Sequence, residues 1–571
     1  MISINITTNC FNYTKRIFLL FILFSLFISK SLSQPLADST KKKIDLLFRK
    51  WDTSDKPGCV FGIVYNDSLI YKGAYGLANV EENIANTTQS IYYMCSVSKQ
   101  FAGYSIALLV KQGKLQLDDD IRRYIPWIAD FGKKITIQHL LNHTSGLRDD
   151  ITLANIKGLP MGGVLNQRIA LNIIGRQTSL NFSPGEKFSY SNSNYILLAE
   201  IVKVVSNLSF NDFVDSQIFK PLGMADSRFI DNESQIIKSR ALSYETENNI
   251  IKNVHQNVYT LGDGGLFTNI IDMSLWIKNF YLPKIGDSTT IDLFTQKGKL
   301  NDGTSINYAM GINVEVFRGQ TRFIHNGGLA GYRTIMAVYP KLKLGFLIFG
   351  NAGDSEVYTK INQLSELFMA DNKEKLKNKE SIPKNTTTSL SLDQGILENF
   401  VGNYIAENGY RLNLKIKDNQ IWLNENNLLI AKSKDTLVLK NNPAVYYVFY
   451  SGNNKQAASV NLISPIYGNK PIKLIRYNSP ISITDKLLQS YTGNYYSSEL
   501  DCIYTITIKN HELFFNNSIN GEAKIMLLDT EHLTSDYEFM KHLLIKRNKK
   551  GEIIGFDINS GAIMNLHFKK M

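Results

Sequence analysis

The sequence has few of the residues that build disulfide scaffolds and metal sites. Its 571 residues include only 4 cysteines, 4 tryptophans and 8 histidines. The cysteines are not closely paired and no His-Glu-x-x-His motif occurs, so we expect no metal ion and no other cofactor. Three cysteines lie beyond the N-terminal segment: Cys59, Cys95 and Cys502. They are too few and too widely spaced to hold the fold together by disulfide bonds.

Long apolar runs are equally scarce, and the one that stands out lies at residues 17–28. Lys15 and Arg16 precede it, and Ser31-Leu32-Ser33 follows it. This order is typical of a secretory signal peptide, so we interpret residues 1–33 as a leader cleaved near Ser33 and expect export to the periplasm or the medium. The alternative, an uncleaved anchor, needs roughly 20 apolar residues. No later stretch is that long, so we expect no membrane span after cleavage.

Basic residues exceed acidic ones by 63 to 51, which gives a net charge of +12. The excess is spread along the chain, with one local run at Lys373, Lys375, Lys377 and Lys379. Broad basicity could favour an anionic cell surface, but a lysine-rich composition with a solvated linker explains it more simply. No nucleic-acid-binding module is apparent, so we expect no nucleic-acid partner.

The order of strand-like and helix-like patterns predicts the fold of residues 36–370. Runs at residues 59–65 and 69–75 indicate a hairpin, and more strand patterns lie between residues 309 and 349. Helical patterns separate these groups or follow them, at residues 96–111, 195–205, 210–219 and 357–368. Strands at both ends predict an α+β domain, in which one antiparallel sheet is closed by distant segments and flanked by helices.

Beyond residue 370 the composition changes twice. Residues 371–395 are rich in Lys, Asn, Thr and Ser and are predicted to form a linker. The remainder is almost wholly β-like and contains a repeat, because Phe400-Val401-Gly402-Asn403-Tyr404 recurs as Tyr491-Thr492-Gly493-Asn494-Tyr495. We therefore predict two similar small barrels or sandwiches, at residues 396–480 and 481–571.

Ser96-Val97-Ser98-Lys99 is the most informative motif of the chain. Positions i and i+3 share one face of a helix, so the Lys99 amine can reach the Ser96 hydroxyl and activate it as a nucleophile. The same spacing occurs by chance at Ser39 and at Ser381. Ser96 alone precedes an apolar stretch that indicates a buried helix, whose start would direct backbone N–H groups at a developing oxyanion.

Two later motifs carry groups that such a nucleophile needs. Tyr190-Ser191-Asn192 offers a phenol that could relay a proton and an amide that can donate to and accept from an acyl substrate. His325-Asn326-Gly327-Gly328 offers an imidazole for an anionic group or a proton, and glycines beside which a strand N–H could complete an oxyanion hole. Each motif alone is more typical of packing or capping, and only the set of three favours a catalytic site.

In order and spacing, the three motifs resemble those of the beta-lactamase-related serine hydrolases of class C type, a penicillin-binding-protein-like family. That family uses Ser-x-x-Lys, then Tyr-x-Asn, then Lys-Thr-Gly or His-x-Gly. Other stretches resemble it too, at residues 140–147, 221–224, 262–266 and 327–332. The resemblance covers roughly residues 42–370 and implies a beta-lactamase/DD-peptidase-like fold.

The resemblance also implies a role for each residue. Ser96 would be acylated, Lys99 and Tyr190 would form the proton-transfer pair, and Asn192 would orient the substrate. His325 would stand where other members have lysine. The N–H groups of Ser96 and Gly328 would form the oxyanion hole, with Gly327 beside them. Which of Lys99 and Tyr190 is the resting base stays open.

We therefore expect an exported serine hydrolase that cleaves an ester, or an amide or peptide with D-residues, through an acyl-enzyme on Ser96. An imidazole, whose ordinary pKa is about 6.5, suits a substrate carboxylate less well than a permanent cation does. The histidine in the third motif therefore argues against antibiotic hydrolysis as the main role. One alternative is a penicillin-binding DD-peptidase or weak beta-lactamase. Another is a catalytically slow protein that binds cell-wall material through its β modules. The expected partner is a small ester, a peptide or a cell-wall fragment.

Overall fold

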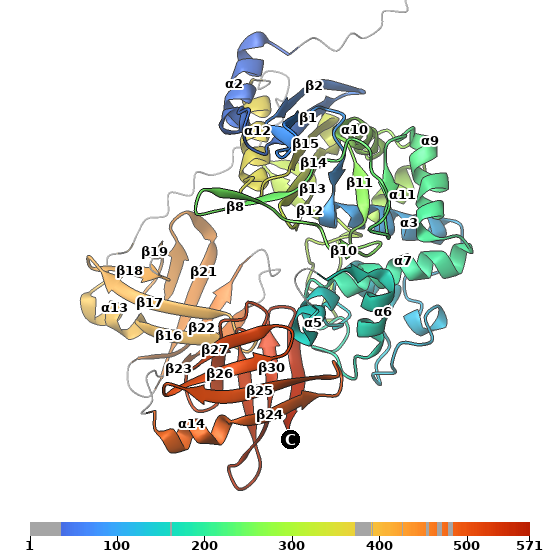
Figure 1. The fold of residues 1–571 in the computed structure, drawn as a ribbon. Helices are drawn as coiled ribbons and strands as arrows, with labels where there is room; N and C mark the ends of the chain where they lie inside the picture. The colour runs from blue at the N-terminus through green and yellow to red at the C-terminus, as the bar shows by residue number, and fades with distance from the viewer. Residues whose placement is uncertain are drawn as a thin grey trace, which may run out of the picture.

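A computed structural model of the protein (Figure 1) describes residues 36–159, 163–371, 390, 392–424, 426–452, 456–464, 471–477 and 483–571. The leader predicted at residues 1–33 and most of the linker predicted at residues 371–395 lie outside these ranges. Within them, no helix has both the length and the apolar character that crossing a membrane requires.

An antiparallel sheet forms the centre of the N-terminal domain, and in the described chain it has six strands in the order β12-β13-β14-β15-β1-β2. The strands are β1 (Cys59–Tyr65), β2 (Ser68–Tyr75), β12 (Asn313–Phe317), β13 (Gln320–Leu329), β14 (Tyr332–Tyr339) and β15 (Leu344–Gly350). β1 pairs with β15 along its whole length, from Cys59 opposite Gly350 to Tyr65 opposite Leu344. Segments from the two ends of the domain therefore close one sheet, which confirms the predicted α+β fold.

Helices cover both faces of this sheet (Figure 1). On one face, α2 (Asp38–Phe48) and α12 (Val357–Asp371) enclose a core in which the rings of Phe48 and Phe61 stack with centroids 4.3 Å apart. On the other face, α10 (Ile270–Asn279) joins the sheet to the main helical region. β15 is buried at every position because both of its faces are covered, which explains its continuous apolar sequence.

The helical region surrounds α3 (Lys99–Lys111), which packs against α7 and α11. Its other helices are α4 (Ile137–Leu141), α5 (Asp150–Lys157), α6 (Gln167–Gly175), α7 (Asn192–Ser206), α8 (Phe210–Val214), a π-helix (Asp215–Phe219), α9 (Lys220–Leu222) and α11 (Ser288–Phe294). Short strands connect them: β3 (Leu77–Asn79), β4 (Ile84–Ala85), β5 (Tyr92–Tyr93), β6 (Leu165–Asn166), β7 (Arg228–Phe229), β8 (Tyr244–Glu247), β9 (Ile250–Asn253), β10 (Val258–Tyr259) and β11 (Leu266–Thr268).

Two elements near the motifs differ from their predicted form. The α-helix begins at Lys99, because Cys95–Ser98 is a 3-10 turn. Side chains at i and i+3 eclipse in a 3-10 turn, so Ser96 and Lys99 still share a face. The sequence predicts a strand at residues 321–324 with His325 at its end, whereas β13 continues to Leu329, so residues 325–328 lie inside the strand. Its pairing with β14, where Gly327 is opposite Thr334, outweighs the low strand preference of glycine.

In the described chain, the C-terminal region forms two closed barrels of eight strands each. After α13 (Gln394–Phe400), the first barrel has β16 (Gly402–Ala406), β17 (Arg411–Lys417), β18 (Gln420–Leu423), β19 (Asn427–Ala431), β20 (Thr436–Leu439), β21 (Asn442–Ser451), β22 (Ala457–Ile463) and β23 (Ile472–Tyr477). After α14 (Asp485–Tyr491), the second has β24 (Gly493–Ser497), β25 (Cys502–Lys509), β26 (Glu512–Asn517), β27 (Gly521–Leu527), β28 (His532–Ser535), β29 (Leu543–Arg547), β30 (Ile553–Ser560) and β31 (Ile563–Lys570).

The sequence repeat corresponds to the same local structure in both barrels. Gly402 and Gly493 have φ angles of 148° and 133°, a region that side chains disfavour. Tyr404 and Tyr495 bury their rings, and each hydroxyl donates to the carbonyl four residues earlier, at 2.9 and 2.7 Å. The predicted pair of related β modules is therefore confirmed, and both are barrels.

The two barrels contact the rest of the protein to different extents. The second barrel lies directly against α5 and α6 (Figure 1), and buried side chains from both join one apolar core. The first barrel reaches its neighbours through the turn after β16. There Glu407 lies 3.9 Å from the amine of Lys187, and Gly409 packs against His542 of the second barrel.

Candidate active site

Ser96 lies in the 3-10 turn that leads into α3. The residue before it, Cys95, has a φ of 49°, which is uncommon for a residue other than glycine. β13 passes so close that a Cβ atom on Gly327 would lie 2.5 Å from the Met94 carbonyl oxygen and 2.8 Å from the Cys95 Cβ. Thr334 of β14 donates its hydroxyl to the same Met94 carbonyl at 2.8 Å. The turn that carries Ser96 is therefore locked against the sheet.

The amine of Lys99 is buried and has three partners. Its Nζ lies 3.2 Å from Ser96 Oγ, 2.7 Å from Asn192 Oδ1 and 2.8 Å from the Asp263 carbonyl oxygen. These partners come from the nucleophile's turn, from the first residue of α7 and from the loop before β11. The fold thus brings together Ser96, Lys99 and Asn192, as the motifs predict.

Tyr190 lies in the segment just before α7, beside the same amine. Lys99 Nζ is 4.9 Å from the centroid of its ring. The imidazole of His143 packs against this ring with centroids 4.2 Å apart, and Tyr308 meets it edge-on at 6.1 Å. Aromatic neighbours therefore hold the phenol next to Lys99.

His325 joins the cluster through Tyr308. Its Nε2 lies 2.9 Å from the Tyr308 hydroxyl, and its Nδ1 lies 2.7 Å from the Asn326 carbonyl oxygen. Burial, together with the charge of Lys99, lowers the pKa of His325 to about 3, so the ring is neutral at physiological pH. Because a carbonyl only accepts, Nδ1 carries the proton and Nε2 accepts from Tyr308. The imidazole is therefore a neutral group with both nitrogens engaged.

Gly327 and Gly328 lie on β13 beyond the end of its neighbour β12. Pairing between the two strands stops where Asn313 faces Ile324. From there on, the edge of β13 contacts the turn that carries Ser96. Gly327 is buried against that turn and Gly328 is exposed. An unpaired strand edge offers backbone N–H groups to a ligand, and Gly328 lies on this exposed part of β13.

A loop of the family-like stretch at residues 140–147 holds the start of α7. The Ser145 hydroxyl donates to Asn194 Oδ1 at 2.6 Å. His143 Nδ1 lies 3.2 Å from the Ser191 nitrogen and 3.1 Å from Asn194 Nδ2. The side chains of His143 and Ser145 thus position the segment that carries Tyr190 and Asn192.

Asp149 is a site residue that the sequence reasoning missed. Its Oδ2 accepts from the backbone N–H and the side-chain amide of Asn192, both at 2.8 Å. Its Oδ1 accepts from the N–H and the hydroxyl of Thr152, both at 2.9 Å. One carboxylate therefore caps α5 and α7 and turns the amide oxygen of Asn192 toward Lys99. The only sequence signal was an Asp at a helix start, which predicts a cap but not a second helix.

Two further carboxyl groups are buried near Lys99. Burial raises the pKa of Asp150 well above its ordinary range, and the neighbouring charge of Asp149 adds to the effect. Burial also raises the pKa of Asp263, which the charge of Lys99 partly offsets. Asp150 Oδ2 has no hydrogen-bond partner among the described residues. The fold thus shifts both carboxyl groups toward their protonated form.

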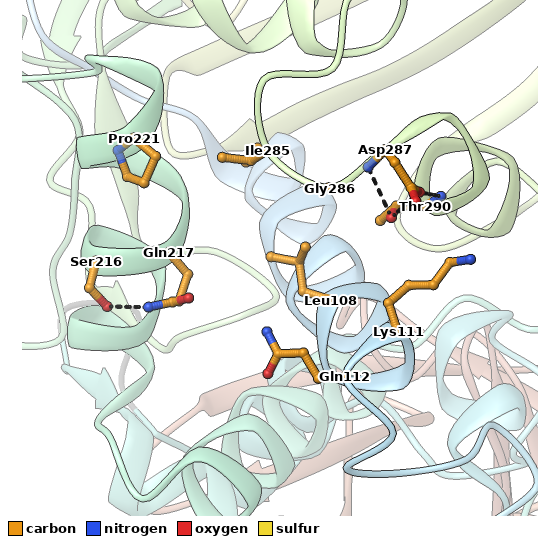
Figure 2. Close-up of a pocket in the computed structure, with 10 residues that line it drawn as sticks. All are labelled: Leu108, Lys111, Gln112, Ser216, Gln217, Pro221, Ile285, Gly286, Asp287 and Thr290. Carbon is orange, nitrogen blue, oxygen red and sulfur yellow. Dashed lines mark hydrogen bonds between the residues drawn. The ribbon is translucent and has the colours of Figure 1, made fainter.

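A separate hollow of about 480 Å³ lies at the other end of α3 (Figure 2). Its lining consists of Leu108, Lys111, Gln112, Ser216, Gln217, Pro221, Ile285, Gly286, Asp287 and Thr290. At 1.5 Å per residue, Gln112 is about 20 Å along the helix from Lys99. This hollow therefore does not belong to the site at Ser96.

Comparison with known sequences places the site in a family context. The Beta-lactamase family profile matches residues 44–367, more than half of the chain. Penicillin-binding protein 4* of Bacillus subtilis (strain 168) is 27% identical over 383 residues, which are 62% of this chain and 81% of that protein. A D-aminopeptidase of Gluconobacter oxydans (strain 621H) is 26% identical over 279 residues, which are 49% of this chain. The match covers 52% of that enzyme, so the chain spans about half of its length.

Two solved structures have a similar fold. The octameric penicillin-binding protein homologue from Pyrococcus abyssi has a TM-score of 0.53 at 22% identity, over 77% of this chain and 99% of that one. D-amino acid amidase from Ochrobactrum anthropi SV3, complexed with L-phenylalanine amide, has a TM-score of 0.51 at 19% identity, over 58% and 99%. At these identities the likeness concerns the fold alone. The family profile spans more than half of the sequence and all three motifs lie within it, so the chain belongs to the beta-lactamase family.

Proposed function

We propose that the protein is an exported serine hydrolase that cleaves an ester, or an amide or peptide with D-residues, through an acyl-enzyme on Ser96. The observation that carries the proposal is the buried amine of Lys99, held between Ser96, Asn192 and Asp263. The penicillin-binding protein and the D-aminopeptidase among its relatives support acyl transfer as the chemistry. Export to the periplasm or the medium is part of the proposal and rests on residues 1–33.

The hydrogen bonds of Lys99 suit a proton acceptor. Asn192 Oδ1 and the Asp263 carbonyl accept two N–H groups whether the amine is neutral or charged. The remaining position faces Ser96 Oγ. There a neutral amine accepts the hydroxyl proton as Ser96 attacks, and the ammonium that results can donate it back. The proton moves between the two residues while the other two hydrogen bonds persist.

In this proposal Tyr190 carries the proton to the leaving group. A phenol hydroxyl can donate and accept at once, so it can hand its proton to the departing alcohol or amine and recover one from Lys99. The N–H groups of Ser96 and Gly328 stabilise the tetrahedral oxyanion. Water then releases the acyl group from Ser96 by the same route in reverse.

The orientation of Asn192 limits what the substrate can offer it. Its amide oxygen is occupied by Lys99, and one of its two N–H groups is occupied by Asp149. The second N–H is left to donate, so the substrate group that meets Asn192 is a hydrogen-bond acceptor such as an acyl or peptide carbonyl.

The state of His325 bears on the choice of substrate. A neutral imidazole with both nitrogens engaged meets a substrate carboxylate without a positive charge. This supports esters and uncharged amides over antibiotics that carry a carboxylate.

A second candidate function is a penicillin-binding DD-peptidase or weak beta-lactamase. The match to penicillin-binding protein 4* favours it.

Intact-mass measurement of adducts on Ser96 tests the proposal. The protein is mixed with an alkyl ester, a D-alanyl amide and a penicillin, and the formation and decay of each adduct are followed. We expect rapid turnover through a transient adduct with the ester or the D-alanyl amide, and none in Ser96→Ala. Ser39→Ala, which alters an exposed Ser-x-x-Lys on α2, is the matched control and keeps full activity.

Each outcome of that measurement selects one function. A long-lived penicillin adduct without ester turnover favours the DD-peptidase. The absence of any adduct in the unmodified protein contradicts the hydrolase and leaves a protein that binds cell-wall material through its barrels. Wild-type turnover in Ser96→Ala overturns the assignment of the nucleophile.

A further inference from the structure

Arg148 lies buried where the second barrel meets the N-terminal domain. Its side chain has no exposed surface, and its guanidinium pairs with Glu499 at 3.2 Å. It also donates to the carbonyl oxygens of Met564 and Asn565 on β31, at 3.0 and 3.2 Å. Within its own domain it donates to the hydroxyl of Ser179 at 2.8 Å. A single guanidinium thus ties the start of α5 to the barrel.

Glu499 is itself held at this interface. It lies between β24 and β25, and its side chain is 7% exposed. Its Oε2 accepts from the N–H and the hydroxyl of Thr178, at 3.2 and 3.1 Å. The Glu499 carbonyl accepts from Arg176 at 2.9 Å. Removing one charge of a buried pair is costly because the other charge is left without a partner, so Arg148 depends on this barrel residue.

The backbone of Arg148 is fixed to the catalytic segment. Its carbonyl oxygen accepts from the Ser193 hydroxyl at 2.7 Å, and its N–H donates to Gln177 Oε1 at 2.9 Å. Ser193 is the second residue of α7, directly after Asn192. The residue after Arg148 is Asp149, whose carboxylate holds the amide of Asn192. A short, continuous set of contacts therefore joins Glu499 to the partner of Lys99.

The barrel also holds the far end of α5. The Tyr504 hydroxyl donates to the Ile156 carbonyl, and Asn520 Nδ2 donates to the Asn155 carbonyl, both at 2.8 Å. The last carbonyl groups of a helix have no partner within it, so barrel side chains complete this helix end. α5 is thus fixed at its start by Asp149 and at its end by the barrel.

We propose that the second barrel is a positioning element of the active site, which acts through Glu499 and Arg148 on Asp149, Asn192 and finally Lys99. Arg148 and Glu499 are positioning residues, because they touch neither the substrate nor the reacting atoms. The inference rests on the proposed function, in which Lys99 and Ser96 exchange a proton. A shift of Asp149 would turn the Asn192 amide and move the lysine amine away from Ser96 Oγ.

Glu499→Gln in the full-length protein tests this inference. It keeps the shape of the side chain and removes the charge that pairs with Arg148. We expect kcat for p-nitrophenyl acetate to fall about 10- to 100-fold, as displaced catalytic groups typically cause. KM changes less, because only Asn192 among the groups that meet the substrate is displaced. Glu499→Asp, which restores the charge, is expected to recover part of the loss in kcat.

Arg547→Gln is the matched control. Arg547 pairs with Glu531 at 3.0 Å within the second barrel. The control therefore loses an ion pair of the same barrel outside the path to Lys99. We expect its thermal unfolding temperature to fall while kcat stays unchanged. If Glu499→Gln lowers the unfolding temperature and leaves kcat unchanged in the same way, the barrel is only a structural support and the inference is wrong.

Labelling of Ser96 with an alkyl fluorophosphonate separates this inference from the proposed function. An unmodified protein that is neither labelled nor active contradicts the proposed function. A labelled, active protein whose kcat is insensitive to Glu499→Gln contradicts only the role of the barrel. If Glu499→Gln does not fold, Thr178→Val removes one hydrogen bond to the same carboxylate. It is expected to lower kcat a few-fold, and an unchanged kcat overturns the inference.

Discussion

Asp149 holds Asn192 at two points, with a single carboxylate oxygen that accepts from its backbone N–H and from its side-chain amide. A flip of the amide would replace the donor that faces Asp149 with an acceptor, and it would also direct the NH2 group at Lys99. The orientation that Lys99 requires is therefore present before any substrate arrives. Such preorganisation of polar groups lowers the free-energy cost of reaching a transition state.

The first prediction concerns Asp149→Asn. An amide at this position can no longer accept four hydrogen bonds, so the hold on Asn192 weakens. We expect kcat for an activated ester to fall about 10- to 100-fold, whereas the helix cap itself survives because Asn caps helices about as well as Asp. Asp287→Asn makes the same change at the cap of α11, in the hollow at the far end of α3. That control should keep kcat, and a similar loss of kcat in both variants contradicts a specific role for Asp149.

The second prediction compares the adjacent glycines of β13. A Cβ on Gly327 would lie 2.5 Å from the Met94 carbonyl oxygen, whereas the nearest atom to a Cβ on Gly328 is 3.6 Å away, on the flexible side chain of Arg333. Gly327→Ala must therefore push the turn of Ser96 away from the sheet. We expect it to lose about 1–3 kcal/mol of stability together with most of its acylation rate. Gly328→Ala should unfold at the wild-type temperature. Equal thermal stability of the two variants would show that the turn is free to move.

The third prediction is a pH dependence. Burial raises the pKa of Asp150 in the folded state, so between its unfolded value near 3.8 and its folded value the folded chain binds the extra proton. Stability due to this residue therefore falls as the pH rises through that window. Asp150→Asn has no such loss, and we expect it to be more stable than wild type at pH 8 and no more stable at pH 3.5. Denaturant titration at both values measures the difference.

Asp287 provides a control of opposite sign for the third prediction. Hydrogen bonds from Thr289 and Thr290 lower its pKa to about 2, so its contribution is present above the unfolded value and is lost as the pH falls toward 2. Asp287→Asn should therefore be less stable than wild type at pH 8, and the deficit should shrink in acid. A loss of stability at pH 8 in Asp150→Asn as well would contradict the protonated form assigned to Asp150.

Much of the fold could be predicted because local pattern and burial agree. β15 is an unbroken apolar run because helices cover both faces of the sheet, and the repeated Gly-Asn-Tyr marks a glycine with positive φ and a buried tyrosine in each barrel. The motifs Ser-x-x-Lys and Tyr-x-Asn could be assigned to one site because their side chains have complementary chemistry, namely a hydroxyl, an amine and an amide. In these places short-range sequence and tertiary structure specify the same arrangement.

The contacts that position the site could not be predicted in the same way. An Asp at position 149 is compatible with a helix start, but nothing local indicates that it also holds a helix 43 residues later. Tyr308, which binds His325, directly precedes the strand patterns predicted from residue 309, although β12 begins only at Asn313. Arg148 and Glu499 are ordinary charged residues until both are buried together. Each of these depends on which distant surfaces meet, and no local pattern records that.

The separation of Arg148 and Glu499 along the chain sets an order of events during synthesis. The two residues are 351 positions apart, so at roughly 5–20 residues per second the guanidinium precedes its carboxylate by about 20 to 70 s. Throughout that time the start of α5 carries a charge that has no place to be buried. Under the proposed role of the second barrel, the active site is encoded early but is completed by a part of the chain that is made later. The proposal therefore implies that a polypeptide still lacking the second barrel has a less ordered active site than the protein that contains it.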